Sequence, residues 1–266
     1  MRFEYFYYNI YLCFNKEKKG KIFIDIYGFI ILCSIIGYLV GSIPFAVILS
    51  KLIYKVDVRK HGSGNAGATN VARTLGAKAG LAVLIFDVLK GGLTPFLMYK
   101  IAESCLTNTH PNQLMYLSII YCVTGACASI GHCHPIFSSF NGGKAVASIC
   151  GFLIFSNYKL FLVAIITFLI IALTTKLVSL GSISAAVMVF IANFIPFFQD
   201  CFTFKYNELN PEIIGTKAPW FIYMICIAFL ALLLIFRHIN NIKRLIKKEE
   251  KKFSFGKFDK QSTNTK

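Results

Sequence analysis

The sequence predicts an all-α membrane protein that crosses the bilayer several times. Of its 266 residues, 56% are hydrophobic and only 15% are charged, and the mean hydropathy is +0.63. A soluble domain of this size does not bury so much apolar surface. The apolar residues also gather into long runs separated by short polar stretches. These observations favour a polytopic bundle of about seven transmembrane helices with polar motif loops at the cytoplasmic face.

The individual spans follow from the rule that a helix needs about 20 apolar residues to cross a bilayer. The fourth and fifth candidates are short and only Ser-Asn-Tyr-Lys separates them, which predicts a tight helical hairpin. Seven spans are expected, with five or six as alternatives. The candidates lie at residues 26–50, 80–101, 114–133, 145–157, 158–176, 180–198 and 219–237.

The chain divides into three parts by composition. Residues 1–25 are an N-terminal extension of unknown role, which fits a targeting segment, an interfacial helix or an upstream start site. The extension lacks a small-residue cleavage site and is therefore a weak signal-peptide candidate. Residues 26–250 are the predicted membrane domain, and residues 251–266 are a basic tail that we expect to be disordered.

The formal net charge of +16 comes from basic residues at the ends of apolar runs and in the C-terminal tail. This placement favours contact with anionic lipid headgroups or anionic substrates. A nucleic-acid partner is not expected, because no soluble basic face with interleaved aromatic residues is present.

The distribution of Lys and Arg also predicts the orientation, because cytoplasmic loops carry an excess of both. Basic residues are concentrated after the first and the last span, whereas the loops at 99–113 and 199–218 are poorer in them. This places the motif loops and the C-terminus in the cytoplasm and the N-terminus outside. Four lysines before the first span oppose this orientation: Lys16, Lys18, Lys19 and Lys21.

The loop at 57–74 predicts an anion-binding site built from backbone N–H groups. Gly62, Gly64 and Gly67 permit positive φ angles, so that successive N–H groups can converge on one anion. Arg59 and Arg73 add forked positive charge. The ATP-binding pattern GxxxxGK[ST] is absent, so ATP hydrolysis is not indicated. A flexible polar connector is the alternative interpretation.

The sequence NGGKA at 141–145 is a second candidate phosphate site at an expected helix start. Gly142 and Gly143 let backbone amides approach a phosphate, and Lys144 supplies a mobile ammonium group. An ordinary turn is the alternative, since Gly-Gly-Lys is common.

Two further polar stretches interrupt the apolar sequence. SLGS at 179–182 offers Ser182, which is either a ligand or part of a helix cap. RHINNIKRL at 237–245 places His238 and Asn241 three residues apart and therefore on one helix face. These two side chains are either part of a site or simple interfacial polar residues.

In their order and spacing these motifs resemble the PlsY family of acyl-phosphate:glycerol-3-phosphate acyltransferases. The similarity covers about residues 26–250 and includes GSIPFAVILSK, HGSGNAGATNVARTLG, DVLKG, GHCHPIFSSFNGGKAVA, SLGSI and RHINNIKRL. The resemblance implies a seven-helix enzyme of the bacterial inner membrane, which makes lysophosphatidic acid in the first step of phospholipid synthesis. Its substrates would be an acyl phosphate and glycerol 3-phosphate, with neither acyl-CoA nor acyl carrier protein used directly.

The resemblance and the motif chemistry together give a set of candidate site residues. We expect the catalytic group to contain Ser63, Arg59, His238 and Asn241. The expected substrate- and phosphate-binding residues are Gly62, Gly64, Asn65, Asn70, Arg73, Gly142, Gly143, Lys144 and Ser182. Glu250 falls where the family has an acidic residue important for integrity. The glycine expected two positions earlier is Lys248 here, and Glu249 is an alternative to Glu250.

An acyl phosphate is a mixed anhydride, so its carbonyl is activated without an enzyme nucleophile. The resemblance suggests direct transfer, with a substrate phosphate oxygen accepting the hydroxyl proton. The alternative is His238 as general base, which its near-neutral reference pKa permits. No cofactor is expected. No metal site is expected either, because His132, Cys133 and His134 lack a second ligand cluster in the sequence.

An organic-phosphate transporter is the alternative function, because glycine-broken segments and basic loops also occur in transporters. Transporters usually place charge near the bilayer midplane, whereas the polar clusters predicted here lie at one face. The expected partners are glycerol 3-phosphate, acyl phosphate and membrane lipids. The sequence does not indicate an oligomeric state.

Overall fold

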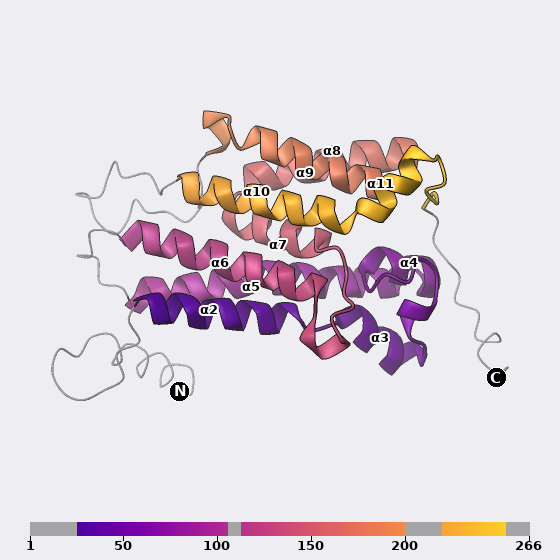
Figure 1. Cartoon of the computed structure of the whole chain (residues 1–266), viewed down its shortest axis with the longest axis horizontal. Helices are drawn as coiled ribbons and strands as arrows, with labels where there is room; N and C mark the ends of the chain where they lie inside the picture. The colour runs from indigo at the N-terminus through magenta and orange to yellow at the C-terminus, as the bar shows by residue number, and fades with distance from the viewer. Residues whose placement is uncertain (1–25, 106–112, 200–219, 254–266) are drawn as a thin grey trace.

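The computed structural model describes residues 26–105, 113–199 and 220–253, and every regular element in these ranges is an α-helix or a short 3-10 helix. The helices form an elongated bundle in which the long apolar helices run side by side (Figure 1). The predicted extension at 1–25, most of the loop at 199–218 and most of the tail after 250 lie outside the described residues. The all-helical fold class is confirmed.

Five helical segments in the described ranges are long and apolar enough to cross a membrane. The first runs through Ile26–Tyr54. The others are α5 (Ala77–Cys105), α6 (Gln113–Cys133) with the 3-10 turn that follows it, α8 (Tyr158–Thr175) and α10 (Trp220–Arg237).

The two remaining predicted spans are shorter helices, α7 (Val146–Ser156) and α9 (Val178–Ala192). With 11 and 15 residues they extend roughly 17 and 23 Å at 1.5 Å per residue, less than the roughly 30 Å of a hydrocarbon core. The described chain thus has five membrane-length segments plus two short apolar helices. The expected count of about seven spans stays a prediction.

The first predicted span, 26–50, is interrupted. Helix α2 (Ile26–Gly41) ends before Ser42, and α3 (Phe45–Tyr54) begins directly after Pro44. Proline lacks an N–H and disfavours a helical conformation in the residue before it, which explains the break. The chain then continues through the 3-10 turn η1 (Val58–Lys60) and α4 (Ala68–Leu75).

The predicted hairpin at the fourth and fifth spans has a one-residue connection. Asn157 lies between α7 and α8, where its Oδ1 accepts a hydrogen bond from the Leu160 N–H at 3.1 Å. Its Nδ2 donates to the Phe198 carbonyl at 2.8 Å. Helix α7 packs mainly on α5, whereas α8 packs mainly on α9. The connection is therefore tight, but each helix has its main partner elsewhere.

Buried aromatic side chains join α6, α7 and α10 in the middle of the bundle. The Tyr121 hydroxyl donates to the Phe152 carbonyl at 2.8 Å, and the Phe152 and Tyr223 rings stack with centroids 5.8 Å apart. All three side chains are almost fully buried. Aromatic pairs in such geometry contribute roughly 0.5–1.5 kcal/mol beyond their burial. This core fixes the helices whose ends carry the polar motifs.

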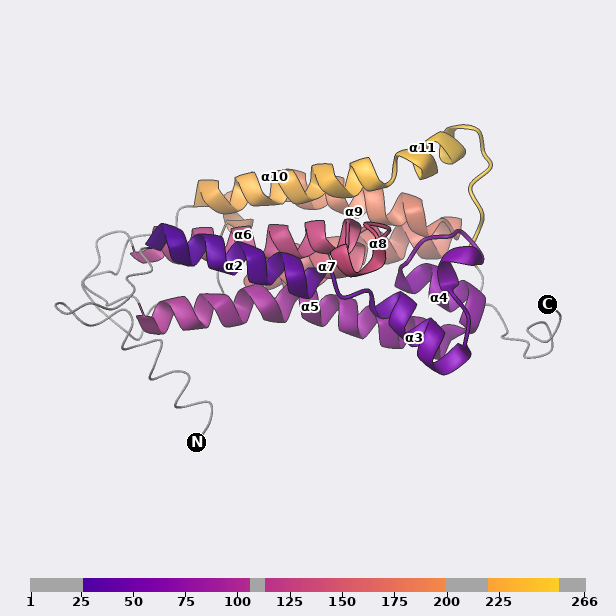
Figure 2. The ribbon, with the colours of Figure 1, turned by 60° about the horizontal axis from the view of Figure 1, so that its bottom comes forward.

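The polar motifs gather at one end of the bundle. Helices α3, α4 and α11 (Ile239–Ile246) lie together at the right of Figure 1 and again in the turned view of Figure 2. The end of α5 and the start of α10 lie at the opposite end in both views. Segments that are far apart in the sequence are thus brought to a common end.

Candidate active site

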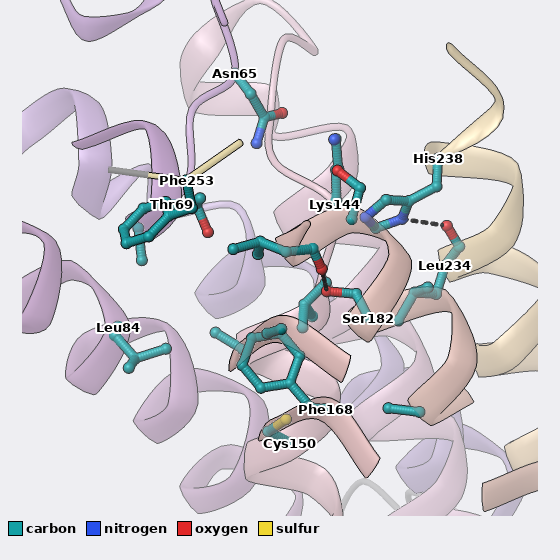
Figure 3. A pocket seen from close by; sticks show the side chains of 18 of the residues that line it. Asn65, Thr69, Leu84, Lys144, Cys150, Phe168, Ser182, Leu234, His238 and Phe253 are labelled. Carbon is teal, nitrogen blue, oxygen red and sulfur yellow. Dashed lines mark hydrogen bonds between the residues drawn. The ribbon is translucent and has the colours of Figure 1, made fainter. Parts of the chain in front are cut away.

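A cavity of about 1160 Å³ opens among the four polar motifs. Deeper in the bundle its lining becomes apolar, with Leu84, Cys150 and Phe168 among the walls (Figure 3). Ten predicted site residues line it: Gly62, Ser63, Asn65, Asn70, Arg73, Lys144, Ser182, His238, Asn241 and Glu250. Four others do not: Arg59, Gly64, Gly142 and Gly143. The cavity combines a polar mouth with an apolar interior.

The first motif loop is organised by the side chain of Asn70, which is buried. Its Oδ1 accepts from the Ser63 N–H at 2.8 Å, and its Nδ2 donates to the Val58 and His61 carbonyls at 3.0 and 3.1 Å. Gly62 has a φ of +63°, and a Cβ there would overlap Asn70 Oδ1. Asn70 therefore holds the loop in shape with every polar atom of its amide.

The two arginines of this motif have different surroundings. The Arg59 guanidinium donates to both carboxylate oxygens of Asp57, at 3.0 and 2.7 Å, and to Ser138 Oγ at 3.0 Å. The hydrogen bond from Arg59 holds the pKa of Asp57 well below its usual range. Arg73 lines the cavity instead, and within the described residues it has no carboxylate partner. Arg59 thus supports the loop, and Arg73 presents a guanidinium to the cavity.

The Gly-Gly-Lys loop lies directly on the end of α6. The Gly143 N–H donates to the His132 carbonyl at 3.0 Å. A Cβ at Gly143 would overlap the His132 ring, and a Cβ at Gly142 would overlap the His132 carbonyl oxygen. The two glycines are therefore required for this close packing, which determines where Lys144 emerges.

Lys144 reaches into the cavity and donates from Nζ to Asn241 Oδ1 at 2.5 Å. Burial lowers the pKa of Lys144 to about 8, an effect that the nearby Glu250 partly opposes. The ammonium group is therefore mostly charged at neutral pH, in a site shielded from water. A cation in such a place binds a phosphate strongly, because less solvent screens the interaction.

Asn241 and Glu250 are the centre of a hydrogen-bond network at the cavity wall. Asn241 Nδ2 donates to Ser179 Oγ at 2.7 Å and to Glu250 Oε1 at 2.6 Å. Glu250 also accepts from Ser179 Oγ at 2.6 Å and from Arg244 Nε at 2.8 Å. Glu250, rather than Glu249, makes these contacts. Ser179 was not among the predicted residues, although it belongs to the same SLGS motif.

His238 is buried beside Lys144 and lines the cavity (Figure 3). Its Nδ1 lies 2.8 Å from the Leu234 carbonyl, so Nδ1–H donates and Nε2 is the free acceptor of the ring. Burial, together with the charge of Lys144, lowers the pKa of His238 to about 4. The imidazole is therefore neutral at pH 7. Ser182, which also lines the cavity, donates from Oγ to the Val178 carbonyl at 3.0 Å.

A buried charge cluster beneath the Gly-Gly-Lys loop was missed by the motif reasoning. Lys90 Nζ lies 2.9 Å from Asp87 Oδ1 and donates to the Ile43 carbonyl at 2.9 Å. His132 Nδ1 lies 3.4 Å from the same Asp87 oxygen. In the described part of the chain no three His, Cys, Asp or Glu side chains are grouped as metal ligands. The sequence DVLKG offered a signal for this cluster, because it places an acidic and a basic residue three positions apart within an apolar run.

The chain is similar to one protein family over most of its length. The family model described as "Glycerol-3-phosphate acyltransferase" matches residues 31–248. The chain is 38% identical over 229 residues to glycerol-3-phosphate acyltransferase 2 of Bacillus cereus, a match that covers 86% of this chain and 98% of the relative. It is also 38% identical over 223 residues to the glycerol-3-phosphate acyltransferase of Bacillus subtilis, covering 84% and 97% of the two chains.

Two solved structures of PlsY, described as an integral membrane glycerol 3-phosphate acyltransferase, share the fold. The glycerol 3-phosphate form is 31% identical with a TM-score of 0.66, and the match covers 85% of this chain and 96% of that chain. The form with lysophosphatidic acid is 29% identical with a TM-score of 0.64, covering 85% and 95%. The family match spans most of the membrane domain and includes all four polar motifs, and the chain therefore belongs to the glycerol-3-phosphate acyltransferase family.

Proposed function

We propose that this enzyme transfers an acyl group from an acyl phosphate to the sn-1 hydroxyl of glycerol 3-phosphate and releases lysophosphatidic acid and inorganic phosphate. The observation that carries the proposal is a cavity in which a cationic mouth, shared by two glycine-rich loops, leads into an apolar interior. Two phosphates and one acyl chain require this combination. The PlsY structures in the glycerol 3-phosphate and lysophosphatidic acid forms support the acceptor and the product.

We assign the acceptor phosphate to the side of the cavity formed by Lys144, Asn241 and His238. Lys144 supplies the charge, and the neutral His238 ring offers Nε2 as a hydrogen-bond acceptor for a substrate hydroxyl. The donor phosphate then lies at the opposite wall, against Ser63, Asn65 and Arg73. The acyl chain extends along the apolar walls deeper in the cavity.

In the proposed reaction the sn-1 hydroxyl oxygen attacks the acyl carbonyl carbon and forms the new ester bond. The bond between that carbon and the phosphate oxygen breaks, and inorganic phosphate departs with the electron pair. The hydroxyl proton passes to a phosphate oxygen of a substrate. The enzyme holds two anions together, aligns the hydroxyl roughly 3 Å from the carbonyl and neutralises the leaving group. No acyl-enzyme intermediate is needed.

The surroundings of His238 favour this direct route over general-base catalysis by the histidine. A group with a pKa of about 4 accepts a proton from a hydroxyl only weakly at pH 7. Replacing His238 by Gln keeps a hydrogen-bonding side chain, so the variant should retain substantial turnover. A loss of about 10⁴-fold in kcat would instead identify His238 as the base.

We propose supporting roles for the remaining predicted residues. Arg59 and Asn70 shape the first loop, Gly62 and Gly64 provide its left-handed backbone, and both have positive φ angles of 63° and 73°. Gly142 and Gly143 seat the second loop on His132. Glu250 orients Asn241, and Ser182 lies on the cavity wall.

We further propose that the end of the bundle with the motif loops faces the cytoplasm of a bacterial inner membrane, with the N-terminus outside. The excess of Lys and Arg at this end supports the orientation. A reporter that fluoresces only in the cytoplasm, fused after residue 266, should be bright. A dark fusion that is stably inserted would reverse the topology.

The direct test is incubation of the purified protein with acyl phosphate and labelled glycerol 3-phosphate, followed by detection of lysophosphatidic acid. Lys144→Ala should raise the KM for glycerol 3-phosphate by about 10- to 100-fold, because a charged hydrogen bond is lost. Lys159→Ala is the matched control, since Lys159 bonds the Phe197 carbonyl at the other end of the bundle.

The same sample tests the transporter alternative. Uptake of glycerol 3-phosphate into vesicles, together with no lysophosphatidic acid at any lipid composition, would favour transport. Complementation of a strain that lacks the acyltransferase, with and without residues 1–25, tests the function in cells and the need for the extension.

A further inference from the structure

The chain turns back toward the cavity after α11. Lys248 has a left-handed backbone with a φ of +60°, and the next residue donates from its N–H to the Arg244 carbonyl at 2.8 Å. Residues 248–253 then form what we call the C-terminal strap. The predicted domain boundary at residue 250 falls inside this strap.

The C-terminal strap is attached at two points. Glu250 accepts hydrogen bonds from Ser179, Asn241 and Arg244, so its carboxylate joins the strap to α9 and α11. Three residues later, the Phe253 N–H donates to the Lys176 carbonyl at 2.8 Å, at the turn between α8 and α9. These attachments fix the path of the backbone across one side of the cavity mouth.

Phe253 is placed by the strap against the first motif. The Arg73 guanidinium carbon lies 5.9 Å from the centroid of the Phe253 ring, within the range of a cation–π contact. Both residues line the cavity. In Figure 3 Phe253 and Thr69 lie on the side of the cavity across from His238. The ring therefore contacts the proposed donor wall, not the acceptor wall.

The kind of contact matters for a guanidinium that has to bind an anion. Arg59, which two carboxylate oxygens hold, has part of its hydrogen-bonding capacity used and its charge compensated. An aromatic ring instead holds a guanidinium by its face, leaves the N–H groups at the edge free and adds no negative charge. Within the described residues Arg73 is held by an aromatic ring, that of Phe253.

We propose that Phe253 is a positioning residue for the acyl donor: its ring, carried by the C-terminal strap, fixes the Arg73 guanidinium for the phosphate of the acyl phosphate. This rests on the proposed function and extends it. The strap thereby makes donor binding depend on a segment about 180 residues beyond the first motif. The acceptor side, built around Lys144, does not require the ring.

The test is a substitution series at Phe253 with steady-state kinetics for both substrates. Phe253→Ala should raise the KM for acyl phosphate about 3- to 10-fold, which corresponds to the usual strength of a partly exposed cation–π contact. The KM for glycerol 3-phosphate should stay within about twofold in the same variant. Phe253→Trp should retain the wild-type value, whereas Phe253→Leu should behave like Phe253→Ala. Wild-type kinetics in Phe253→Leu would reduce the ring to apolar packing and overturn the proposal.

A second pair of variants tests the strap without touching Phe253. Lys248→Val places a β-branched residue at a φ of +60°, which it adopts only at high cost, so the strap should detach. Lys247→Val is the matched control, because Lys247 has a φ of −79° and ψ of −1° that valine tolerates. The KM for acyl phosphate should rise in Lys248→Val and not in Lys247→Val. An equal rise in this KM in both variants would show that the loss of a lysine charge, and not the path of the strap, weakens donor binding.

Two truncations define the functional end of the chain. Termination after Phe253 should preserve the kinetics, and termination after Lys252 should reproduce Phe253→Ala.

The proposed function is tested separately by the turnover of the wild-type enzyme. If the wild type forms no lysophosphatidic acid, the proposed function is contradicted, but the contact between Phe253 and Arg73 is not. In that case the rise in melting temperature caused by inorganic phosphate decides the inference. The rise should be smaller in both Phe253→Ala and Phe253→Leu than in the wild type, and an unchanged rise would overturn it.

Discussion

The two glycine-rich loops have similar compositions but are held in place differently. In the loop at 57–74 the bonds of Asn70 reach residues seven to 12 positions away. In the loop at 141–145 the hydrogen bond of Lys144 reaches Asn241, 97 positions away. The first loop thus largely organises itself, whereas the second takes its shape from neighbouring helices.

Substitutions in two segments of similar composition are therefore expected to impair binding for different physical reasons. Changes within the first loop should act locally and affect the acyl donor. Changes beneath the second loop should affect stability as well as acceptor binding, because its supports are buried in the bundle.

The largest effect is expected for the charge cluster beneath the second loop. Lys90→Met removes the ammonium that lies 2.9 Å from Asp87 and leaves a buried carboxylate poorly compensated. Breaking such a pair costs about 3–5 kcal/mol of stability. Thermal unfolding in detergent should show a large fall in melting temperature. The double variant Asp87→Asn with Lys90→Met should recover much of it, and a double variant as unstable as the single one would contradict the pairing.

The next effect is expected in the first loop. Asn70→Ala removes three hydrogen bonds that shape the backbone around Ser63, so kcat/KM for acyl phosphate should fall roughly 10- to 100-fold. The KM for glycerol 3-phosphate should change much less. Steady-state kinetics with each substrate varied in turn measures both values. A larger effect on the acceptor than on the donor would remove the distinction between the two loops.

A smaller effect is expected from adding one methyl group to the second loop. Gly143→Ala would press a Cβ against the His132 ring and shift Lys144, so the KM for glycerol 3-phosphate should rise about tenfold. Ala145→Gly is the control in the same loop, because Ala145 has a φ of +58° that glycine adopts freely. If both variants kept the wild-type KM, the packing of Gly143 against His132 would not determine the position of Lys144.

The smallest effect is a pH dependence that belongs to the second loop alone. Because the pKa of Lys144 is lowered to about 8, the ammonium loses its proton as the pH rises through that value. The kcat/KM for glycerol 3-phosphate should therefore fall about twofold between pH 7 and pH 8, and further above. Lys144→Arg should remove this inflection because its guanidinium stays charged. An inflection that persists in Lys144→Arg belongs to another group.

Parts of the site were predictable because their geometry is local. The positive φ angles of Gly62 and Gly64 were expected from glycine itself, whereas Gly67 has an extended backbone with a φ of −143° at the start of α4. The common face of His238 and Asn241 was expected from helical spacing, although His238 turned out to precede α11 rather than lie within it. The left-handed backbone at Lys248 likewise occupies the position where the resemblance called for a glycine.

Other parts were not predictable, because they depend on which side chains meet across the bundle. The sequence analysis assigned Arg59 to the catalytic group and Arg73 to phosphate binding, yet Asp57 and Ser138 bind Arg59 away from the cavity, and Arg73 lines it. Phe253 lies in a stretch whose basic composition predicts disorder. In the structure it contacts Lys176 and Arg73, which are distant from it in the chain.

Hydrophobic run length and glycine spacing are properties of short segments, so the sequence alone indicated a helical membrane protein and predicted two anion-binding loops, while the enzymatic activity followed from the resemblance of its motifs to a known family. Only the tertiary structure decided that five segments have membrane length, that Asp87, Lys90 and His132 form one cluster, and that the strap returns to the cavity. The physical reason is that burial and charge pairing depend on the packing of distant helices, which no local pattern encodes.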